Sequence, residues 1–573
     1  MTSTFAKIPP VIDVKEFGIV KEIKKDIVKI DGLDNCLNME LVSFSGGGFG
    51  MVMGFDETET LALVISPSVE IKVGDRVFSR KVPLTIAVGT RFIGRIVNAL
   101  SEPLDGKGAI EPDDMYPVFK VAPGVLEREP VTDTMETGIL SIDSMFPVGK
   151  GQRELILGDK LTGKTSIGTD AILNQKGKNV ICIYCCVGKP HVSLEKVIKL
   201  LRDMDALEYT IVVAATATAP TGARYLAPYT AATLAEYFMH HGRDSLVIFD
   251  DLTKHAWGYR ELSLLLERSP GRDAYPGDIF YLHSQLMERA GRLKKDLGGG
   301  TATYLPIVEL TQGDMTAYIP SNIVSMTDGQ LVLNTSSFSE GFRPALDTGL
   351  SVSRIGSKVQ SKAMKKLSGM LRLEYIQYRE LAQISKVSST RSEEVADKLA
   401  HGQAITQILI QKNNSPRSTE EAIVLLYCLR EGLLDKLEED QLKTFIDTVF
   451  AFLAKQYPEL IKELAAKREL SNDIVSGLQS ALEAFMLRGG YKGIFFEQRK
   501  AAKNINNVLK DMIGIIAARK DMDATQKKEM MDALKALEIS ADELEKMTRK
   551  ELFERIETIE TAIKLPDEQR TKK

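Results

Sequence analysis

The sequence predicts a multidomain α/β protein with an N-terminal β-barrel, a central α/β domain and a helical C-terminal part. The chain of 573 residues is too long for one hydrophobic core, its hydrophobic pattern changes along its length, and a glycine-rich GDKLTGKTS stretch joins a strand to a helix. The expected parts are a barrel over 1–82, an α/β domain over 83–365, a helical domain over 366–490 and a helical extension over 491–573.

The N-terminal part alternates short apolar runs with turns. FGIVKEI, DIVKIDGL, LALVIS and GDRVFSR are separated by Gly, Asp and Asn, which is typical of a small β-barrel. From about Pro83 to Gln360, longer buried runs such as RELILG, NVICIYCCVG, SLVIFDD and TYLPIVEL alternate with helical stretches. That alternation predicts a mostly parallel sheet with helices on both faces.

Beyond about Ser361 the periodic Leu, Ile and Ala predict helices, as in MLRLEYIQYRELAQI and EEAIVLLYCLREGLLDKL. The last 80 or so residues also follow a helical period, and Ser540 with Glu543 and Thr548 with Glu551 fit the capping box. The tail is therefore expected to be helical. Whether its apolar faces pack on the body, which is the favoured reading, or on a partner stays open.

Composition excludes some classes of function. The 74 basic and 78 acidic residues give a net charge of −4, which argues against a protein that mainly coats nucleic acid or anionic lipid. The CxxC of Cys182 and Cys185 lies in an apolar strand-like run, so its sulfurs are expected on opposite faces as buried thiols. The N-terminus resembles no signal peptide and no run reaches the length of a membrane span, so a soluble, cytoplasmic chain is expected.

The GDKLTGKTS stretch has the spacing of a phosphate-binding loop. Its glycines allow the backbone to curl around phosphate oxygens, Lys164 adds positive charge, and the Thr165 hydroxyl can ligate Mg²⁺. The following helix offers its N-terminus to the same anion. The residues predicted to hold the nucleotide phosphates are Gly158, Asp159, Lys160, Leu161, Thr162, Gly163, Lys164, Thr165 and Ser166.

A second motif follows later in the chain, where the apolar strand SLVIFDD ends in two aspartates. A carboxylate at a strand end can hold the water shell of Mg²⁺ across from Thr165, and an aspartate before a helix can also cap it. We therefore assign Asp250 to the metal, with Thr165, and Asp251 to capping. The expected cofactors are ATP or ADP and Mg²⁺.

With these motifs in place, the chain resembles the α subunit of F-type rotary ATP synthases over about residues 11–490. The likeness rests on long ordered segments, including GQRELILGDKLTGKTSIGTDAILNQK, SPGRDAYPGDIFYLHSQLMERAGRL and RPALDTGLSVSRIG. The resemblance implies a β-barrel crown, a P-loop nucleotide domain of RecA-like type and a helical bundle. It also implies a ring of three α and three β subunits around a central γ-type shaft, held at the cytoplasmic face of the membrane through partners.

The resemblance also bears on hydrolysis, which needs a carboxylate near the γ phosphate to activate water. In the catalytic β relative that glutamate follows the glycine after the strand, and the usual α subunit has glutamine there. This chain has Lys189 after Gly188, so its site is expected to bind nucleotide and to hydrolyse it slowly or not at all. The alternative is a shifted alignment in which Glu195 or Asp251 is the base.

The same resemblance assigns further residues. GLSVSRIG resembles the segment that delivers an arginine finger to the β subunit, so Arg354 would act in trans on the catalytic site of that subunit. The alternative is that Arg354 forms a salt bridge at the subunit interface. The resemblance also implies an adenine pocket lined by Phe338, Arg343, Gln411 and Asn413. The ordinary alternatives are that Phe338 is a core aromatic and that Asn413 caps a loop. The family has glutamine in place of Asn413 and an aromatic in place of Ser339, so base specificity is less well defined than phosphate binding.

Three rival functions remain to be weighed. A hexameric helicase with this ring fold would need a basic stripe with aromatics, and the barrel stretch SGGGFGMVMGFDETET has acidic neighbours and no Lys or Arg. A self-sufficient ATPase would turn over as an isolated chain. Because the stretch before the barrel is only about ten residues and the tail adds about 80, a motor that drives something other than proton translocation is the alternative, with the 491–573 tail binding stalk or adaptor proteins.

Overall fold

The computed structural model describes residues 16–55, 58–66, 71–385, 393–435 and 437–489, with 509, 510, 513 and 528 in addition. The predicted helical extension over 491–573, with its two capping boxes, lies outside these described residues, apart from the few isolated positions. The described chain divides into two compact units. One contains the residues up to 376 together with 409–419, and the other contains 377–408 and the residues from 420 on.

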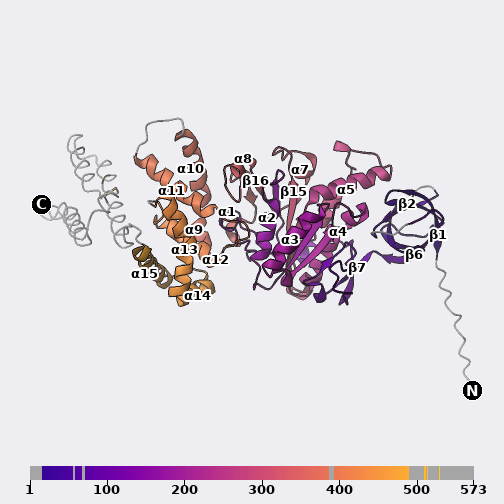
Figure 1. Ribbon diagram of the computed structural model, residues 1–573, viewed down its shortest axis with the longest axis horizontal. Coiled ribbons are helices and arrows are strands. Elements are labelled where there is room, and N and C mark those ends of the chain that lie inside the picture. Colours follow the sequence, from indigo (N-terminus) through magenta and orange to yellow (C-terminus); the bar gives the residue numbers. More distant parts are fainter. Residues whose placement is uncertain are drawn as a thin grey trace, which may run out of the picture. The chain divides into compact units, whose positions relative to one another are not determined.

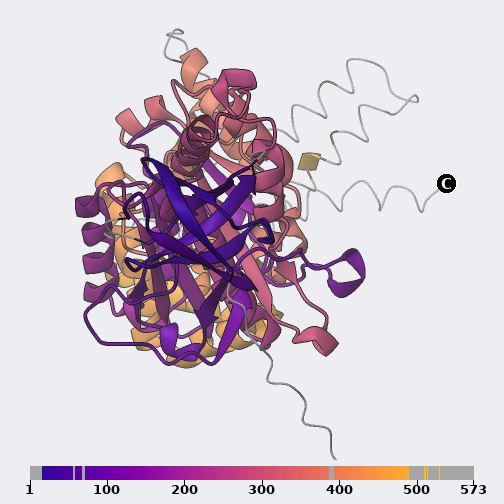
Figure 2. The same cartoon turned by 90° about the vertical axis from the view of Figure 1, so that its right-hand side faces the viewer.

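The N-terminal strands close into a barrel in the order β1-β2-β5-β4-β3-β6 (Figures 1 and 2). Buried side chains from the strands, among them Val20, Val28, Val42 and Val52, form the apolar core of the barrel. The predicted barrel is therefore confirmed. Its strands are β1 Phe17–Lys24, β2 Ile27–Asp31, β3 Glu40–Phe44, β4 Phe49–Phe55, β5 Thr60–Val64 and β6 Arg76–Pro83.

The central domain is built on a sheet in the order β17-β16-β10-β15-β13-β11-β12-β8, with β14 paired to β15. Its pairings are parallel except for those of β14 and β17. The strands are β8 Ile96–Val97, β10 Glu154–Gly158, β11 Val180–Val187, β12 Thr210–Ala215, β13 Asp244–Asp250, β14 Gly291–Arg292, β15 Thr301–Glu309, β16 Gly329–Leu333 and β17 Val352–Ser353. A separate ribbon pairs β7 Thr85–Val88 with β9 Asp114–Pro117.

Helices cover both faces of this sheet, as the alternating pattern predicts. One apolar core joins the sheet to α1, α2 and α3 and contains Cys182 and Cys186, whereas the other joins it to α4, α5, α6, α7 and the barrel and contains Cys185. The CxxC sulfurs therefore lie on opposite faces and are buried, as expected. The helices are α1 Leu140–Met145, α2 Lys164–Leu173, α3 His191–Asp203, α4 Thr221–His240, α5 Leu252–Leu265, α6 Ile279–Met287, α7 Tyr318–Met326, α8 Thr335–Ser339 and α9 Lys362–Ser368.

The C-terminal part is helical, as predicted. Phe485 packs edge-on against Phe445, with ring centroids 5.2 Å apart, and this contact joins α13 to α15. Its helices are α10 Leu371–Ser385, α11 Glu393–Leu409, α12 Thr419–Arg430, α13 Glu439–Gln456, α14 Pro458–Lys467 and α15 Asn472–Gly489. In the described part of the chain, no helix is both long and apolar enough to cross a membrane.

The three-part architecture is thus confirmed, whereas the limits assigned to the domains stay predictions. Residues 409–419, between α11 and α12, belong to the same compact unit as the central sheet. This return of the chain brings Gln411 and Asn413 to the nucleotide domain, which places them beside the site described next.

Candidate nucleotide-binding site

A cavity of about 670 Å³ lies at the carboxyl ends of the central strands. The loop after β10, the residues that follow β11 and β13, and the end of β15 line it, together with Phe338, Arg343 and the segment 411–413. Ligands of doubly wound sheets bind at this edge, and the volume is in the range of sites for small organic ligands.

The predicted phosphate loop lies at one end of this cavity and has the backbone that its glycines allow. Gly163 has a left-handed φ of 99° and is the N-cap of α2. A Cβ on Gly158 would lie 2.7 Å from Thr162 Oγ1, so the tight curl admits no side chain there. The first N–H groups of α2 therefore begin at the cavity, where they can receive an anion.

The loop residues divide between those that line the cavity and those that support the loop. Lys160 to Ser166 line the cavity, whereas Gly158 and Asp159 do not. The Asp159 carboxylate instead accepts hydrogen bonds from the Gly313 N–H at 2.8 Å and the Thr335 hydroxyl at 2.7 Å. Asp159 thus ties the phosphate loop to its neighbours.

Lys164 is the buried cation of the loop. Its ammonium donates to the carbonyl of Gly158 at 2.8 Å and also contacts the carbonyl of Asp159. Burial lowers the pKa of Lys164, and nearby carboxylates, with Glu309 first, oppose that shift. An anion bound in the cavity would add to that opposing effect, so phosphate binding and the charged form of Lys164 support each other.

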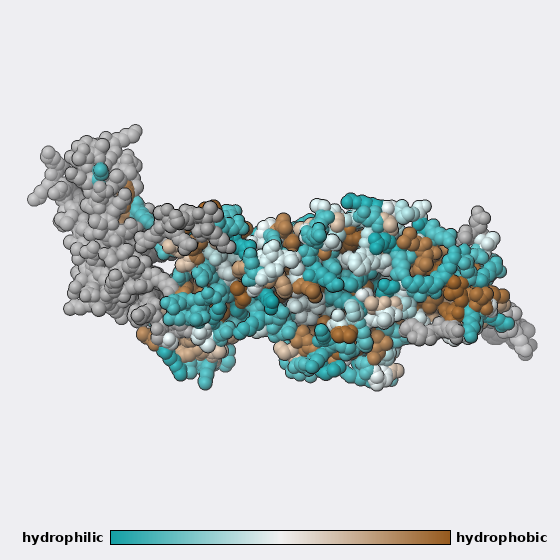
Figure 3. Space-filling view, turned by 45° about the horizontal axis from the view of Figure 1, so that its top comes forward, coloured by the Kyte–Doolittle hydropathy of each residue, from teal (hydrophilic) through white to brown (hydrophobic). Residues whose placement is uncertain are grey.

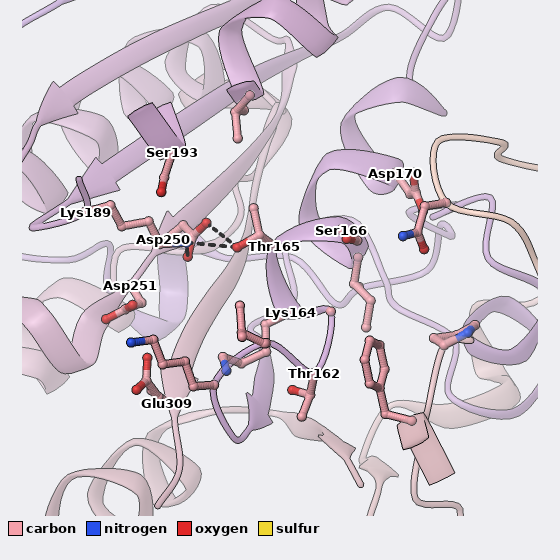
Figure 4. Close-up of a pocket in the computed structure, with 18 of the residues that line it drawn as sticks. Thr162, Lys164, Thr165, Ser166, Asp170, Lys189, Ser193, Asp250, Asp251 and Glu309 are labelled. Atoms are coloured by element: carbon pink, nitrogen blue, oxygen red, sulfur yellow. Dashed lines mark hydrogen bonds and ion pairs between the residues drawn. The ribbon is translucent and has the colours of Figure 1, made fainter. Parts of the chain in front are cut away.

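Three side chains converge beside this loop, as Figure 4 shows: Thr165, Asp250 and Lys189. Thr165 donates to Asp250 Oδ2 at 2.8 Å, and the Lys189 ammonium donates to Thr165 Oγ1 at 2.8 Å. Lys189 also forms an ion pair with Asp250 Oδ1. This buried oxygen accepts no hydrogen bond from the residues that the structure describes, so the ion pair is the contact that the structure gives it. The buried Tyr184 hydroxyl donates to Asp250 Oδ2 at 2.7 Å. Both oxygens of Asp250 are therefore engaged by protein groups.

These contacts bear on the magnesium expected at Thr165 and Asp250. A hydroxyl and a carboxylate are oxygen ligands of the kind that Mg²⁺ takes. However, the Lys189 ammonium lies against both groups, so a protein cation holds the place between them. The residues therefore do not fit a magnesium ion while Lys189 keeps these contacts, and the assignment of Thr165 and Asp250 to a metal stays a prediction.

The other carboxylates of the cavity are engaged as well. Asp251 accepts the Lys254 backbone N–H at 2.9 Å as the N-cap of α5, which confirms its predicted capping role. The Lys254 ammonium forms an ion pair with Asp251 and lies 3.7 Å from a Glu309 oxygen. Glu195, the alternative base, is exposed on α3 and does not line this cavity.

Phe338 and Arg343 also line the cavity and lie together. The Arg343 guanidinium carbon is 5.1 Å from the centroid of the Phe338 ring, a cation–π arrangement. Asn334 caps the short helix α8, because its side chain accepts the N–H groups of Ser336 and Ser337. An aromatic face and a guanidinium on the cavity wall form a surface on which a planar base can stack.

Gln411 and Asn413 also line the cavity, but only one of them is available to a base. Gln411 is buried and donates both amide hydrogens within the protein, to the carbonyls of Gly138 at 2.7 Å and Ser415 at 2.8 Å. Gln411 therefore lines the cavity, as expected of it, and its amide has no hydrogen left to donate to a base. Asn413 is exposed at the cavity.

Sequence reasoning missed several lining residues, among them Asp170. This buried carboxylate on α2 accepts the backbone N–H of Asn414 at 2.9 Å, and burial raises its pKa to about 6. Its place on the helix that follows the phosphate loop was a usable signal. Tyr184, Lys254 and Glu309 gave none, because strand and helix patterns do not reveal which polar residue faces a cavity.

Arg354, the predicted finger, does not line the cavity. It is exposed directly after β17, the edge strand of the sheet, and its backbone N–H donates to the carbonyl of Asp328 at 2.9 Å. This position is compatible with action on another chain and not with action on its own phosphate loop.

Comparisons with known proteins agree with this architecture. Residues 13–79 match the beta-barrel domain of the ATP synthase alpha/beta family, 138–353 match its nucleotide-binding domain, and 360–485 match the C terminal domain of the alpha/beta chain. The chain is 42% identical over 478 residues to ATP synthase subunit alpha of Petrotoga mobilis, which covers 83% of this chain and 95% of that protein. It is 44% identical over 489 residues to the subunit alpha of Clostridium acetobutylicum, which covers 85% and 96%. The chain therefore belongs to the ATP synthase alpha/beta family, as an alpha-type member.

Proposed function

We propose that this chain is a non-catalytic, nucleotide-binding α-type subunit in a ring of three α-type and three β-type subunits around a γ-type shaft. ATP or ADP binds in the cavity with its phosphates on the loop from Gly158 to Ser166 and its base near Phe338 and Arg343. The observation that carries the proposal is the contact of the Lys189 ammonium with Thr165 and Asp250. By the resemblance, Lys189 stands where a catalytic relative has its carboxylate.

The absence of catalysis follows from proton chemistry. A general base must accept a proton from the attacking water, and a protonated lysine cannot. The cavity carboxylates among the described residues are Asp170, Asp250, Asp251 and Glu309, and each accepts hydrogen bonds or lies near a lysine ammonium. The cavity thus favours anion binding over water activation.

The contribution to catalysis lies at Arg354. An exposed arginine at the edge of the sheet can reach a neighbouring subunit and stabilise the negative charge that develops on a transferring phosphoryl group. Its guanidinium is permanently charged and presents several donors to phosphate oxygens. We therefore assign Arg354 as the arginine finger for the β-type partner.

Exposed apolar side chains on the barrel support assembly. Figure 3 shows hydrophobic patches over the barrel, and Phe17, Ile19 and Phe55 on its strands are 48%, 47% and 51% exposed. Apolar surface of this kind is typical of protein contacts. The ring would sit at the cytoplasmic face of the membrane through its partners, and the 491–573 tail would bind stalk or adaptor proteins. Nothing in the comparisons favours the alternative of a motor for a process other than proton translocation.

The proposal is tested by assaying the isolated full chain and the ring assembled with its β-type partner. The isolated chain is expected to bind ATP and to release phosphate at least about 10³-fold more slowly than the ring, because it lacks the general base. Native mass spectrometry of the complex should give three copies of each subunit type. Turnover by the isolated chain within tenfold of the ring would contradict the non-catalytic assignment.

A further inference from the structure

We propose that the Lys189 ammonium takes the place of the divalent cation, so that this site binds nucleoside di- or triphosphate in its metal-free form. Lys189 would then link Thr165 and Asp250 to a phosphate oxygen. This inference rests on the proposed nucleotide binding and deepens it, because it names the form of the ligand that the site accepts.

The first support is the position of Lys189, which is set by strand pairing and by backbone hydrogen bonds. Strands β11 and β13 pair in parallel with Cys186 opposite Asp250, so the residues after β11 lie beside the end of β13. The Gly188 N–H donates to the Ala215 carbonyl at 2.7 Å, and the Lys189 carbonyl accepts the Ala217 N–H at 2.9 Å. These bonds hold the backbone on both sides of Lys189 Cα, so its side chain is directed at Asp250 and Thr165.

The second support is the set of hydrogen bonds around the ammonium. Thr165 donates its one hydrogen to Asp250 and accepts from Lys189, while Tyr184 donates to the same Asp250 oxygen as Thr165. A lysine ammonium has three N–H donors. Two of them face Thr165 and Asp250, which leaves one for a phosphate oxygen. The ammonium therefore can link the same groups that a metal ion would link in a phosphate loop.

The third support is charge. Lys164, Lys189 and Lys254 all line the phosphate end of the cavity. Magnesium demands near-ideal octahedral geometry at about 2.1 Å from its ligands and gives up its water reluctantly. It would have to displace the Lys189 ammonium from Thr165 and Asp250 while leaving that charge close by. Because Asp250, Asp251 and Glu309 line the same cavity and pair with Lys189 and Lys254, this local displacement, and not the net charge of the surface, favours the metal-free polyphosphate.

The test measures ATP and ADP binding to the isolated full chain by calorimetry, once with a chelator and once with Mg²⁺. The wild-type Kd is expected to differ by less than about threefold between the two conditions, because Lys189 supplies the positive charge. Lys189→Gln restores the glutamine of usual α subunits. In this variant, nucleotide binding in the presence of chelator is expected to be about tenfold weaker or more, and addition of Mg²⁺ should restore the affinity. Lys196→Gln, on the exposed face of α3, removes the same charge and should change neither value.

A second readout is independent of nucleotide affinity. Mn²⁺ is added to the nucleotide-saturated chain, and bound Mn²⁺ is counted by electron paramagnetic resonance. The wild type should bind no Mn²⁺ at this site, whereas Lys189→Gln should bind close to one ion per chain. If that variant fails to fold, the wild-type measurement still decides, since one tightly bound Mn²⁺ per nucleotide would overturn the inference.

The outcomes separate the two proposals. Wild-type binding that appears only with Mg²⁺ would overturn the metal-free inference and leave nucleotide binding intact. No binding under either condition would overturn the proposed nucleotide site itself. A loss in Lys196→Gln equal to that in Lys189→Gln would show a general charge effect and would also overturn the specific role of Lys189.

Discussion

The cavity and the exposed edge of the sheet each have a cationic side chain just after a strand, and the two cations differ in their exposure to solvent. The Lys189 side chain is 16% exposed and its charge is paired with the buried Asp250. Arg354 follows an edge strand and is exposed. A cation neutralised by its own chain serves the pocket that contains it, whereas an exposed cation is available to another surface. The difference fits the proposal that one region binds nucleotide and the other acts on a partner.

The largest expected effect is that of removing the exposed cation, Arg354. In the assembled ring, Arg354→Ala is expected to lower turnover about 10³-fold or more, because the charge on the transferring phosphoryl group loses its stabiliser. Nucleotide binding to the isolated chain should remain nearly unchanged. Steady-state ATP hydrolysis by the ring and calorimetry on the chain give the two values.

The matched control is Lys358→Ala, which removes an exposed cation four residues further along the chain. It should leave turnover within a few-fold of wild type, since surface charges away from a site contribute little. If Arg354→Ala lowered the turnover of the ring by less than about tenfold, the arginine-finger role would be contradicted and an interface salt bridge would be favoured.

The next effect concerns the buried half. Lys164→Met keeps most of the side-chain volume but removes the ammonium that lies against the phosphate loop. We expect nucleotide binding to the isolated chain to weaken by roughly 100-fold, because charge-assisted hydrogen bonds to phosphate are lost. Lys160→Met, in the same loop but exposed, should weaken it only a few-fold. Equal losses in the two variants would show that burial of Lys164 does not matter for binding.

The smallest effect is a change in stability at Asp170. Burial raises the pKa of this carboxyl from 3.8 to about 6, so the folded state binds a proton more tightly than the unfolded chain. The free energy of unfolding therefore falls as pH rises from about 4 to about 6, and the unfavourable contribution is complete above that range. A two-unit shift corresponds to about 3 kcal/mol at most.

Asp170→Asn keeps an oxygen to accept the Asn414 N–H and removes the ionisation. It should therefore raise the free energy of unfolding at about pH 7 and have little effect near pH 4, as measured by urea denaturation at both values. Asp203→Asn, at the exposed end of α3, is the control and should show no such difference. A gain of equal size at both pH values would exclude ionisation as the cause.

Much of this could be predicted from local sequence. The strand-to-helix turn at GDKLTGKTS, the barrel, the parallel sheet and the capping by Asp251 all follow from spacing and periodicity, and the structure confirms these elements. The role of Gln411 could not be predicted, because its amide bonds to Gly138, a residue distant in the chain. The resemblance implied that Gln411 lines the adenine pocket, and only the fold shows that its amide is already bonded within the protein.

The sequence by itself determined that a stretch with phosphate-loop spacing joins a strand to a helix and that a lysine follows the next strand. Only the tertiary structure decided what that lysine does. Thr165 and Lys189 are 24 residues apart, and Thr165 and Asp250 are 85 apart. Parallel pairing of β11 with β13 places Lys189 beside Asp250, and the packing of α2 on the sheet brings Thr165 to both. The strength of an ion pair depends on distance and on exclusion of water, and both are set by packing.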